Sequence, residues 1–247
     1  MPKIDIVHLG CRDPDAQCEF YCSTLGMRRF GDSIVGYDNA VEAKLHFFQC
    51  SEPYQARPND LYWKIALSVP NIELACQQLR QRNIEINPPF QFQDVGYLAH
   101  FTDPEGYTIE LIDHWFEGQR PDLVLDAGLL GGGAHFSLLT LRAADIEPVQ
   151  SLCRELGMTP LAVEPVEGRG FTLYFYGFTD ETPPNSDLRA VENRPWLYQR
   201  PYTVLEIQHV PELNLGEPAP PDQATYRGAS LNGLETPLPL NDLMLIV

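Results

Sequence analysis

The sequence predicts an α+β fold built from repeated modules, each with a strand, a helix and further strands. Three observations predict it. The same order of strand and helix patterns occurs three times along the chain, the tripeptide Leu-Gly-Met closes a predicted helix at 25–27 and again at 156–158, and turn residues separate the predicted strands. The repeated tripeptide indicates an internal duplication.

The first module shows these signals most fully. Asp13 supplies a side-chain acceptor and Pro14 a fixed φ angle, so a helix is predicted to begin at residue 14 and to end at Gly26. Strand patterns surround this helix, at 4–13, 28–38 and 40–50.

The second and third modules repeat the order. In the second, the strand pattern YWKIALSV precedes a predicted helix, and two further strands follow it, joined by the turn DPEG. In the third, AHFSLLTL precedes a helix that ends at Gly157, followed by the strand patterns FTLYFYGF and YTVLEIQHV. The proline-rich segment 211–247 has no such helix, so a fourth module is missing or remodelled.

Residues between the second and third modules have the composition of a linker, with Pro and several Gly. We therefore expect residues 4–114 to form a two-module domain, 115–133 a linker, and 134–247 a second, truncated or remodelled domain. The third module would pair with the tail or with another subunit, which makes a homodimer one of the arrangements to test.

Composition limits the partners. The net charge of −17 is unfavourable for binding phosphate backbones or anionic lipids, so we expect neither nucleic acid nor membrane partners. The N-terminus has no apolar signal region, and no stretch reaches the roughly 20 apolar residues that cross a bilayer. The six cysteines form no C-x-x-C pair, which is typical of reduced thiols. We expect a cytoplasmic protein with a small-molecule substrate.

The segments DPEGYTIEL, FYCSTLGM and IALSVPNIELACQQL resemble the vicinal-oxygen-chelate superfamily, which includes glyoxalase I, bleomycin resistance proteins and extradiol dioxygenases. The third module, with GRGFTLYFYGFTDETP, is similar to the first module of longer glyoxalase I enzymes. The resemblance implies βαβββ modules whose curved mixed sheets surround a cavity, with helices on the convex side. It also implies metal ligands on the first and last strands of each paired module.

Carried over to this chain, the resemblance assigns metal ligands in the first half. Glu110 falls on the family's glutamate position, and alternation with Ile109 and Leu111 favours a ligand over a solvated strand residue. His8 lies two residues from the aligned position, on the same face of its strand, and His46 aligns approximately with the last strand. Lys64 stands where a second histidine is expected, and an ammonium group cannot bind a metal.

The second half and the substrate-facing strand supply the other candidates. His135 is a metal candidate offset from its aligned position, and Glu206 is assigned to catalysis. His100 precedes the DPEG turn, where related enzymes place an acid-base group, so it is assigned to proton transfer. An ordinary strand histidine is the alternative for His100.

Three functions follow from the resemblance. The first is a glyoxalase-I-like lyase or isomerase that uses a divalent metal (Zn, Ni or Fe(II)) on a hydroxy-carbonyl or hemithioacetal substrate. The second is an extradiol-type dioxygenase with Fe(II) on His8, His46 and Glu110. The third is a metal-free protein that binds a small molecule in the same pocket.

Overall fold

The computed structural model describes residues 2–216, 219–234, 241 and 243–246. Three modules have the predicted order of strand, helix and three strands. The first contains β1, α1, β2, β3 and β4 (Lys3–Cys11, Pro14–Leu25, Arg28–Gly31, Ile34–Gly36 and Lys44–Gln49). The second contains β5, α2, β6, β7 and β8 (Tyr62–Val69, Ile72–Gln81, Phe90–Phe92, Gly96–Thr102 and Thr108–Asp113).

The third module contains β9, α3, β10, β11 and β12 (His135–Ala143, Ile146–Glu155, Thr159–Val166, Phe171–Gly177 and Val204–His209). An insertion between β11 and β12 carries the short helix α4 (Arg194–Leu197). The tail adds β13 (Tyr226–Asn232) and β14 (Leu245–Ile246). The two 3-10 turns are Leu130–Gly132 and Val191–Asn193.

Local signals determine where the first helix begins and ends. The Asp13 side chain accepts a hydrogen bond from the backbone N–H of Ala16, and Pro14 occupies the first turn. Gly26 has a φ of 78°, a left-handed conformation that favours glycine, and its N–H donates to the carbonyl of Cys22. The predicted limits of this helix are confirmed.

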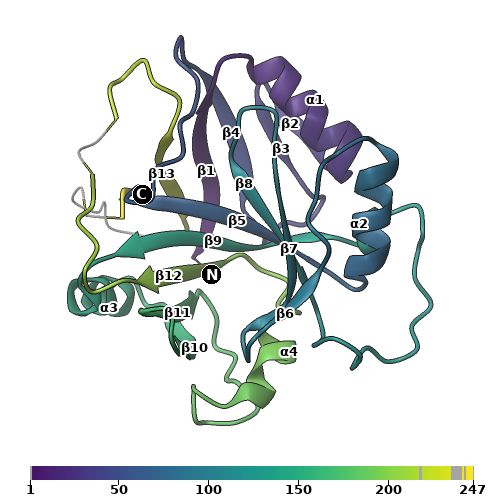
Figure 1. The fold of residues 1–247 in the computed structure, drawn as a ribbon. Coiled ribbons are helices and arrows are strands. Elements are labelled where there is room, and N and C mark those ends of the chain that lie inside the picture. The colour runs from purple at the N-terminus through teal and green to yellow at the C-terminus, as the bar shows by residue number, and fades with distance from the viewer. Residues whose placement is uncertain (1, 217–218, 235–240, 242, 247) are drawn as a thin grey trace.

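The strands form two sheets. One has the order β14-β13-β1-β4-β3-β2 and the other β10-β11-β12-β9-β5-β8-β7-β6. Figure 1 shows the two groups of strands running in different directions, with α1 and α2 adjacent on one side of the molecule. This arrangement confirms the predicted α+β class with curved mixed sheets.

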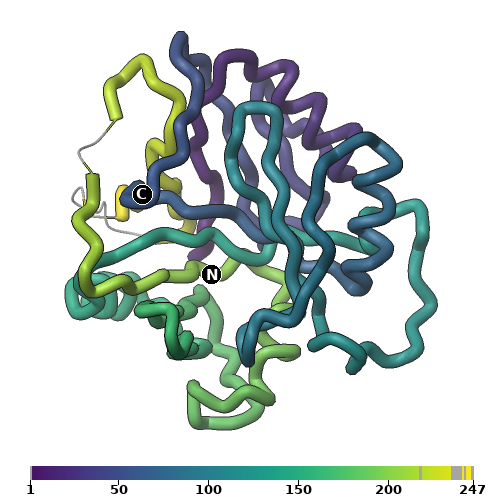
Figure 2. Tube along the Cα trace, viewed as in Figure 1, coloured from purple at the N-terminus to yellow at the C-terminus, as the bar shows by residue number. Residues whose placement is uncertain are grey.

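The modules pair differently from the expected grouping. Strand β5 of the second module lies antiparallel to β9 of the third, so one sheet crosses the segment expected to be a linker. Figure 2 shows these two parts of the chain trace running side by side. The first module pairs instead with the tail, through β1 and β13. The expectation that residues 4–114 form a complete two-module sheet is therefore wrong.

The burial of β5 explains this pairing. Seven of its eight residues are buried, which is typical of a strand at the centre of a sheet covered on both faces. Such a strand needs a hydrogen-bonded neighbour on each edge, because unpaired buried backbone groups are unfavourable. The neighbours are β8 and β9.

Two hydrophobic cores lie on opposite faces of the eight-stranded sheet. The larger core joins both sheets to α1, α2 and α3, through residues such as Tyr21, Leu79, Cys153, Leu45 and Leu139. The smaller core lines the concave face of the eight-stranded sheet and includes Ala66, Ile112 and Leu138. Helices α1, α2 and α3 thus lie on the convex side, whereas Leu197 of α4 belongs to the smaller core on the concave face, where a site can form. In the described part of the chain, none of the helices has the length and hydropathy needed to cross a membrane.

Candidate functional site

A group of polar side chains lies on the concave face where the second and third modules meet. The four central strands of the sheet are β12, β9, β5 and β8, the first and last strands of the two modules. Each strand contributes one buried polar side chain to this group, namely Glu206, Thr140, Lys64 and Glu110, besides other buried polar residues that lie elsewhere along these strands. Strand register brings three of them to one level, because Thr140 is paired with both Lys64 and Glu206. Glu110 is paired with Ala66, two residues along β5 from Lys64 and on the same face.

The ammonium group of Lys64 connects the two modules. Its Nζ lies 2.9 Å from Oε1 of Glu110 and 2.9 Å from Oε2 of Glu206. It also donates to Oγ1 of Thr140 at 3.0 Å. Lysine has three N–H donors, so these contacts use all of them. The Thr140 hydroxyl in turn donates to Oε2 of Glu206.

His100 extends this network toward the surface. It lies on β7, directly opposite Glu110 of β8 in the antiparallel register. Its Nε2 is 3.0 Å from Oε2 of Glu110, and its side chain is 28% exposed. A carboxylate can only accept a hydrogen bond, so Nε2 carries the proton and Nδ1 keeps a lone pair when the ring is neutral.

The charges of the two central groups are determined by each other. Burial works to lower the pKa of Lys64, but the attraction of two carboxylates outweighs it and raises that pKa above its usual value. Burial works to raise the pKa of Glu110, but Lys64 and then His100 hold that pKa well below its usual range. At neutral pH Lys64 is an ammonium and Glu110 a carboxylate, so Lys64 has no free amine for nucleophilic attack.

A partly open cavity of about 200 Å³ lies in front of this network. Its floor contains Lys64, Glu110 and Glu206. Its walls are mainly aromatic and aliphatic, with Phe92, Val95, Leu98, Ile112, Leu138 and Leu173 among them. A larger depression of about 910 Å³ shares Trp63 and His100 with the cavity. These two residues therefore stand between the cavity and this depression.

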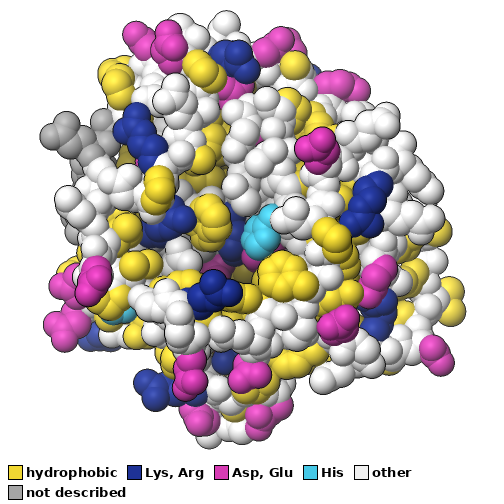
Figure 3. Space-filling view, in the orientation of Figure 1, with side chains coloured by type: hydrophobic (Ala, Val, Ile, Leu, Met, Phe, Trp, Pro, Cys, Tyr) yellow, Lys and Arg dark blue, Asp and Glu magenta, His cyan; other side chains and the backbone are white. Residues whose placement is uncertain are grey.

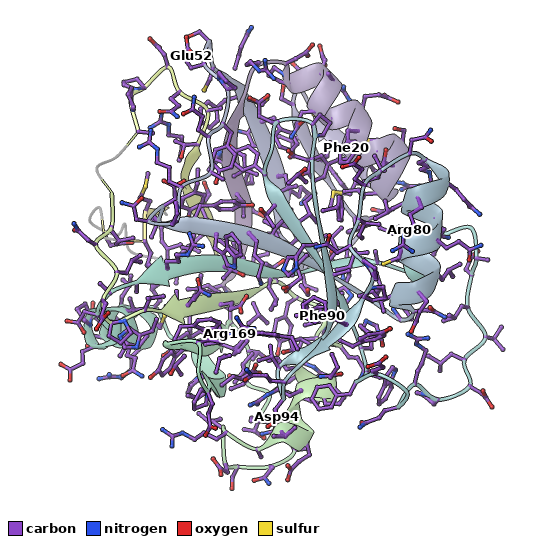
Figure 4. All side chains as sticks on the ribbon, in the orientation of Figure 1. Phe20, Glu52, Arg80, Phe90, Asp94 and Arg169 are labelled. Atoms are coloured by element: carbon purple, nitrogen blue, oxygen red, sulfur yellow. The ribbon has the colours of Figure 1, made fainter. Side chains whose placement is uncertain are left out.

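The surface view agrees with this arrangement. Figure 3 shows a hollow near the centre of this face, where a histidine side chain lies among basic, acidic and hydrophobic side chains. Figure 4 places Phe90 of β6 and Arg169 of the β10–β11 turn on the lower side of the same region. The Arg169 guanidinium lies 5.7 Å from the ring centre of Phe92, and Gln93 donates to the carbonyl of Glu167. The β6–β7 turn and the β10–β11 turn thus meet at this end of the cavity and close it.

The insertion before β12 closes the concave face from below. Tyr198 lines the cavity, and its hydroxyl donates to the carbonyl of Val95 at 2.7 Å. Arg194 lies 2.7 Å from the buried carboxylate of Glu164, although the two groups lack the alignment of a hydrogen bond. Burial raises the pKa of Glu164 well above its usual value in spite of this neighbour.

The donor set does not fit a divalent metal. The resemblance places ligands on the first and last strands of paired modules, and here those strands supply an ammonium, a hydroxyl and two carboxylates. The ammonium has no lone pair and holds both carboxylates itself. Among the residues that the structure describes, no group of three or more His, Cys, Asp or Glu side chains could hold a metal ion.

His8 and His46 come together, but in the other sheet. They are paired on β1 and β4, and their Nδ1 atoms lie 3.0 Å apart. The Nε2 of His8 lies 2.8 Å from the hydroxyl of Ser230 on β13. Burial lowers the pKa of both rings, and His46 lowers that of His8 further. The two histidines thus lie together, but they do so in the six-stranded sheet and not in the sheet that carries Glu110.

The expected set of His8, His46 and Glu110 is not assembled. Val7 and Ile109, the neighbours of His8 and Glu110 along their strands, both belong to the core between the sheets. Because side chains alternate along a strand, His8 and Glu110 point away from that core on different sheets. The reason is the pairing of the second module with the third, which turns Glu110 toward Glu206 instead.

His135 lies at the other end of β9 from Thr140. It is paired with Ser68, and its ring centre is 5.6 Å from that of His114. Burial lowers the pKa of His135 to about 4 and that of His114 to about 3. The distance along the strand separates His135 from Glu206, its expected companion in the second half.

Several residues of the site are absent from the sequence prediction. Thr140, Gln208 and Arg142 lie in no recognised motif. In the sequence, Lys64 is noted only because it stands where a histidine ligand is expected. Arg142 lies over the ring of Trp63 and donates from Nε to Oε1 of Gln208 at 3.0 Å. One signal was present in the sequence: a lysine inside a strand that is otherwise apolar requires a buried anionic partner.

The chain is similar in fold to solved structures of low sequence identity. Glyoxalase I from Zea mays has 16% identity and a TM-score of 0.62, over 94% of this chain and 74% of that one. A candidate dioxygenase from Bacillus subtilis has 14% identity and a TM-score of 0.56, over 93% and 69%. At such identities the likeness shows the fold alone. No curated protein sequence matches the chain.

The paired modules and curved sheet define a protein of the vicinal-oxygen-chelate fold. Residues 3–111 match the family model described as Glyoxalase/Bleomycin resistance protein/Dioxygenase superfamily. The site of this chain departs from the metal-binding pattern at Lys64.

Proposed function

We propose that this protein binds a small, mainly apolar molecule in the cavity between its second and third modules, without a metal ion. The observation that carries the proposal is the cavity itself: apolar walls enclose a floor of charged groups that already satisfy one another. Apolar pockets with a few convergent polar groups are the usual form of small-molecule sites.

The size of the cavity indicates the size of the bound group. A dry cavity of roughly 150 Å³ is enough to hold a benzene-sized molecule, and this one measures about 200 Å³. The aromatic side chains Phe92 and Phe171 lie in its walls. A single ring or a short branched chain is the expected occupant, with any larger portion in the outer depression.

Two polar side chains are left to orient the molecule. Glu110 engages Nε2 of His100, so Nδ1 of His100 keeps its hydrogen-bonding capacity. Arg142 engages Oε1 of Gln208, and among the described residues no side chain or backbone group takes the amide hydrogens of Gln208. Both residues line the cavity, so a ligand with a carbonyl or hydroxyl group is favoured over a pure hydrocarbon.

Ligand-observed NMR tests the proposal, with 2-hydroxyacetophenone and benzyl alcohol as probes and chelator present throughout. Leu138→Trp fills the cavity and should weaken binding by more than about tenfold, because displaced apolar contacts are each worth on the order of 1 kcal/mol. Val124→Trp adds the same side chain at an exposed position and should leave binding unchanged. Equal binding by all three proteins would rule out the cavity as the site.

A second candidate function is metal-independent proton transfer on the bound molecule, as in an isomerase. The contact between His100 and Glu110 favours it, because a carboxylate that orients an imidazole leaves the other ring nitrogen to accept a proton. In D₂O with chelator, the protein should speed exchange of the CH₂ protons of 2-hydroxyacetophenone, and His100→Gln should remove the effect. No acceleration over buffer would leave binding as the function.

A further inference from the structure

We propose that the ammonium group of Lys64 is the resident cation of this site, taking the place that a divalent ion holds in metal-dependent members of the superfamily. A second part of the inference follows: the two carboxylates form a latent metal site that replacement of Lys64 would open. This inference concerns the charge in the floor and is independent of which ligand occupies the cavity.

Position is the first argument. Glu110 and Glu206 come from the last strands of two different modules, and Lys64 bridges them at 2.9 Å on each side. The side chains of all three residues are at most 6% exposed. Any ion bound by both carboxylates would have to occupy the space that now contains Nζ.

Charge is the second argument. Two buried carboxylates this close to each other repel strongly unless a cation lies between them. Lys64 supplies one positive charge, His100 lies against the second oxygen of Glu110, and Thr140 donates a further hydrogen bond to Oε2 of Glu206. The floor is therefore stable without an added ion.

Energetics is the third argument. A buried group of charges rarely stabilises a fold more than apolar side chains of the same volume, because desolvation opposes the attraction. Stability alone therefore does not account for Lys64 between two glutamates at the floor of a cavity. A fixed cation that contacts both carboxylates, and that no chelator can remove, is the property this arrangement adds.

The latent site follows from the donors that remain. Carboxylate oxygens bind zinc at about 2.0–2.2 Å and imidazole nitrogen at about 2.0–2.1 Å. A histidine in place of Lys64 would supply one nitrogen beside the two glutamates, and the site would have three protein ligands. A leucine at the same position removes the ammonium but adds no donor.

Metal binding tests the inference directly. Wild type, Lys64→His and Lys64→Leu are stripped with chelator, dialysed and titrated with ZnCl₂ and NiCl₂ by calorimetry, and the bound metal is counted by mass spectrometry. Lys64→His should bind one equivalent on the order of 100-fold more tightly than wild type or Lys64→Leu. Adding Glu206→Gln to Lys64→His should abolish that gain. His46→Ala in every background removes the contribution of the pair of histidines in the other sheet.

Two results would overturn the inference. One is a stoichiometric zinc or nickel ion in wild type that Glu110→Gln removes, because the metal would then displace Lys64. The other is a folded Lys64→His variant, verified by circular dichroism, that gains no metal affinity. If Lys64→His folds neither with nor without metal, Lys64→Gln, which offers an amide oxygen, takes its place under the same two criteria.

Discussion

Nζ of Lys64 and Oε2 of Glu206 lie 2.9 Å apart, although they belong to different modules and stand 142 positions apart in the chain. Strand β9 lies between their strands, and Thr140 on that strand contacts both groups. Glu110 of the second module also contacts Lys64, so the buried group of three charged side chains is complete only once the second and third modules have joined.

This dependence predicts a large stability loss for Lys64→Leu. Removing one member of a buried ion group leaves uncompensated charge, and the free energy of unfolding should fall by about 3–5 kcal/mol at pH 7.5. The triple variant Lys64→Leu, Glu110→Gln, Glu206→Gln removes the charges together and should recover much of the loss. Urea unfolding of the three proteins measures both effects, and equal stability of the single and triple variants would contradict the explanation.

A second prediction concerns acid. Burial of the ring lowers the pKa of His135 from its usual value to about 4 in the folded protein. As the pH falls below about 6.5, the ring is therefore protonated in the unfolded chain before it is protonated in the folded one. Above pH 6.5 the ring is neutral in both states and has no effect on stability. As the pH drops toward 4, proton uptake by the unfolded chain lowers the free energy of unfolding.

His135→Phe keeps an aromatic ring and removes this penalty. Between pH 7.5 and pH 4.5 the variant should lose roughly 2–3 kcal/mol less unfolding free energy than wild type. Urea unfolding at the two pH values gives the comparison. The same pH dependence in both proteins would show that the ring is protonated in the folded state.

A third prediction follows from module pairing. Residues 1–115 alone would leave β5 without β9 and β1 without β13. Exposed edges on such apolar strands favour aggregation over folding. The fragment should lack a cooperative thermal transition, and co-refolding with 116–247 should restore it. A fragment that melts cooperatively by itself would contradict this prediction and support a separate domain that ends at residue 114.

A fourth prediction separates two glycines of the segment between the modules. Gly131 and Gly118 both have positive φ angles, of 56° and 73°. A Cβ at Gly131 would lie 2.7 Å from Cβ of Val69, whereas one at Gly118 meets nothing within 4 Å. Gly118→Ala should cost about 1 kcal/mol for the backbone alone.

Gly131→Ala should cost about 1–3 kcal/mol more than that, because Val69 or the backbone must move. The free energies of unfolding from urea titrations of the two variants test the difference. Equal losses would mean that this segment adjusts freely against β5, which would support its description as a linker.

Much of the module architecture could be predicted from the sequence because its causes are local. Asp13 and Gly26 limit the first helix through contacts with their own neighbours, and alternation along β8 places Ile109 and Glu110 on opposite faces. Such signals act within a few residues. The resemblance to the superfamily could be recognised from the sequence for the same reason, because the motifs that carry it include a turn and a helix end.

The sequence by itself determined the modules, the faces of their strands and the presence of Glu110, Glu206 and His100 on them. Only the tertiary structure decided that β5 pairs with β9, because edge pairing between strands depends on which apolar faces can be buried together across the whole chain. That choice separates Glu110 from His8 and brings it to Glu206 and Lys64. A lysine that reads as a missing ligand in the sequence becomes the cation of the site, because long-range packing places two carboxylates around it.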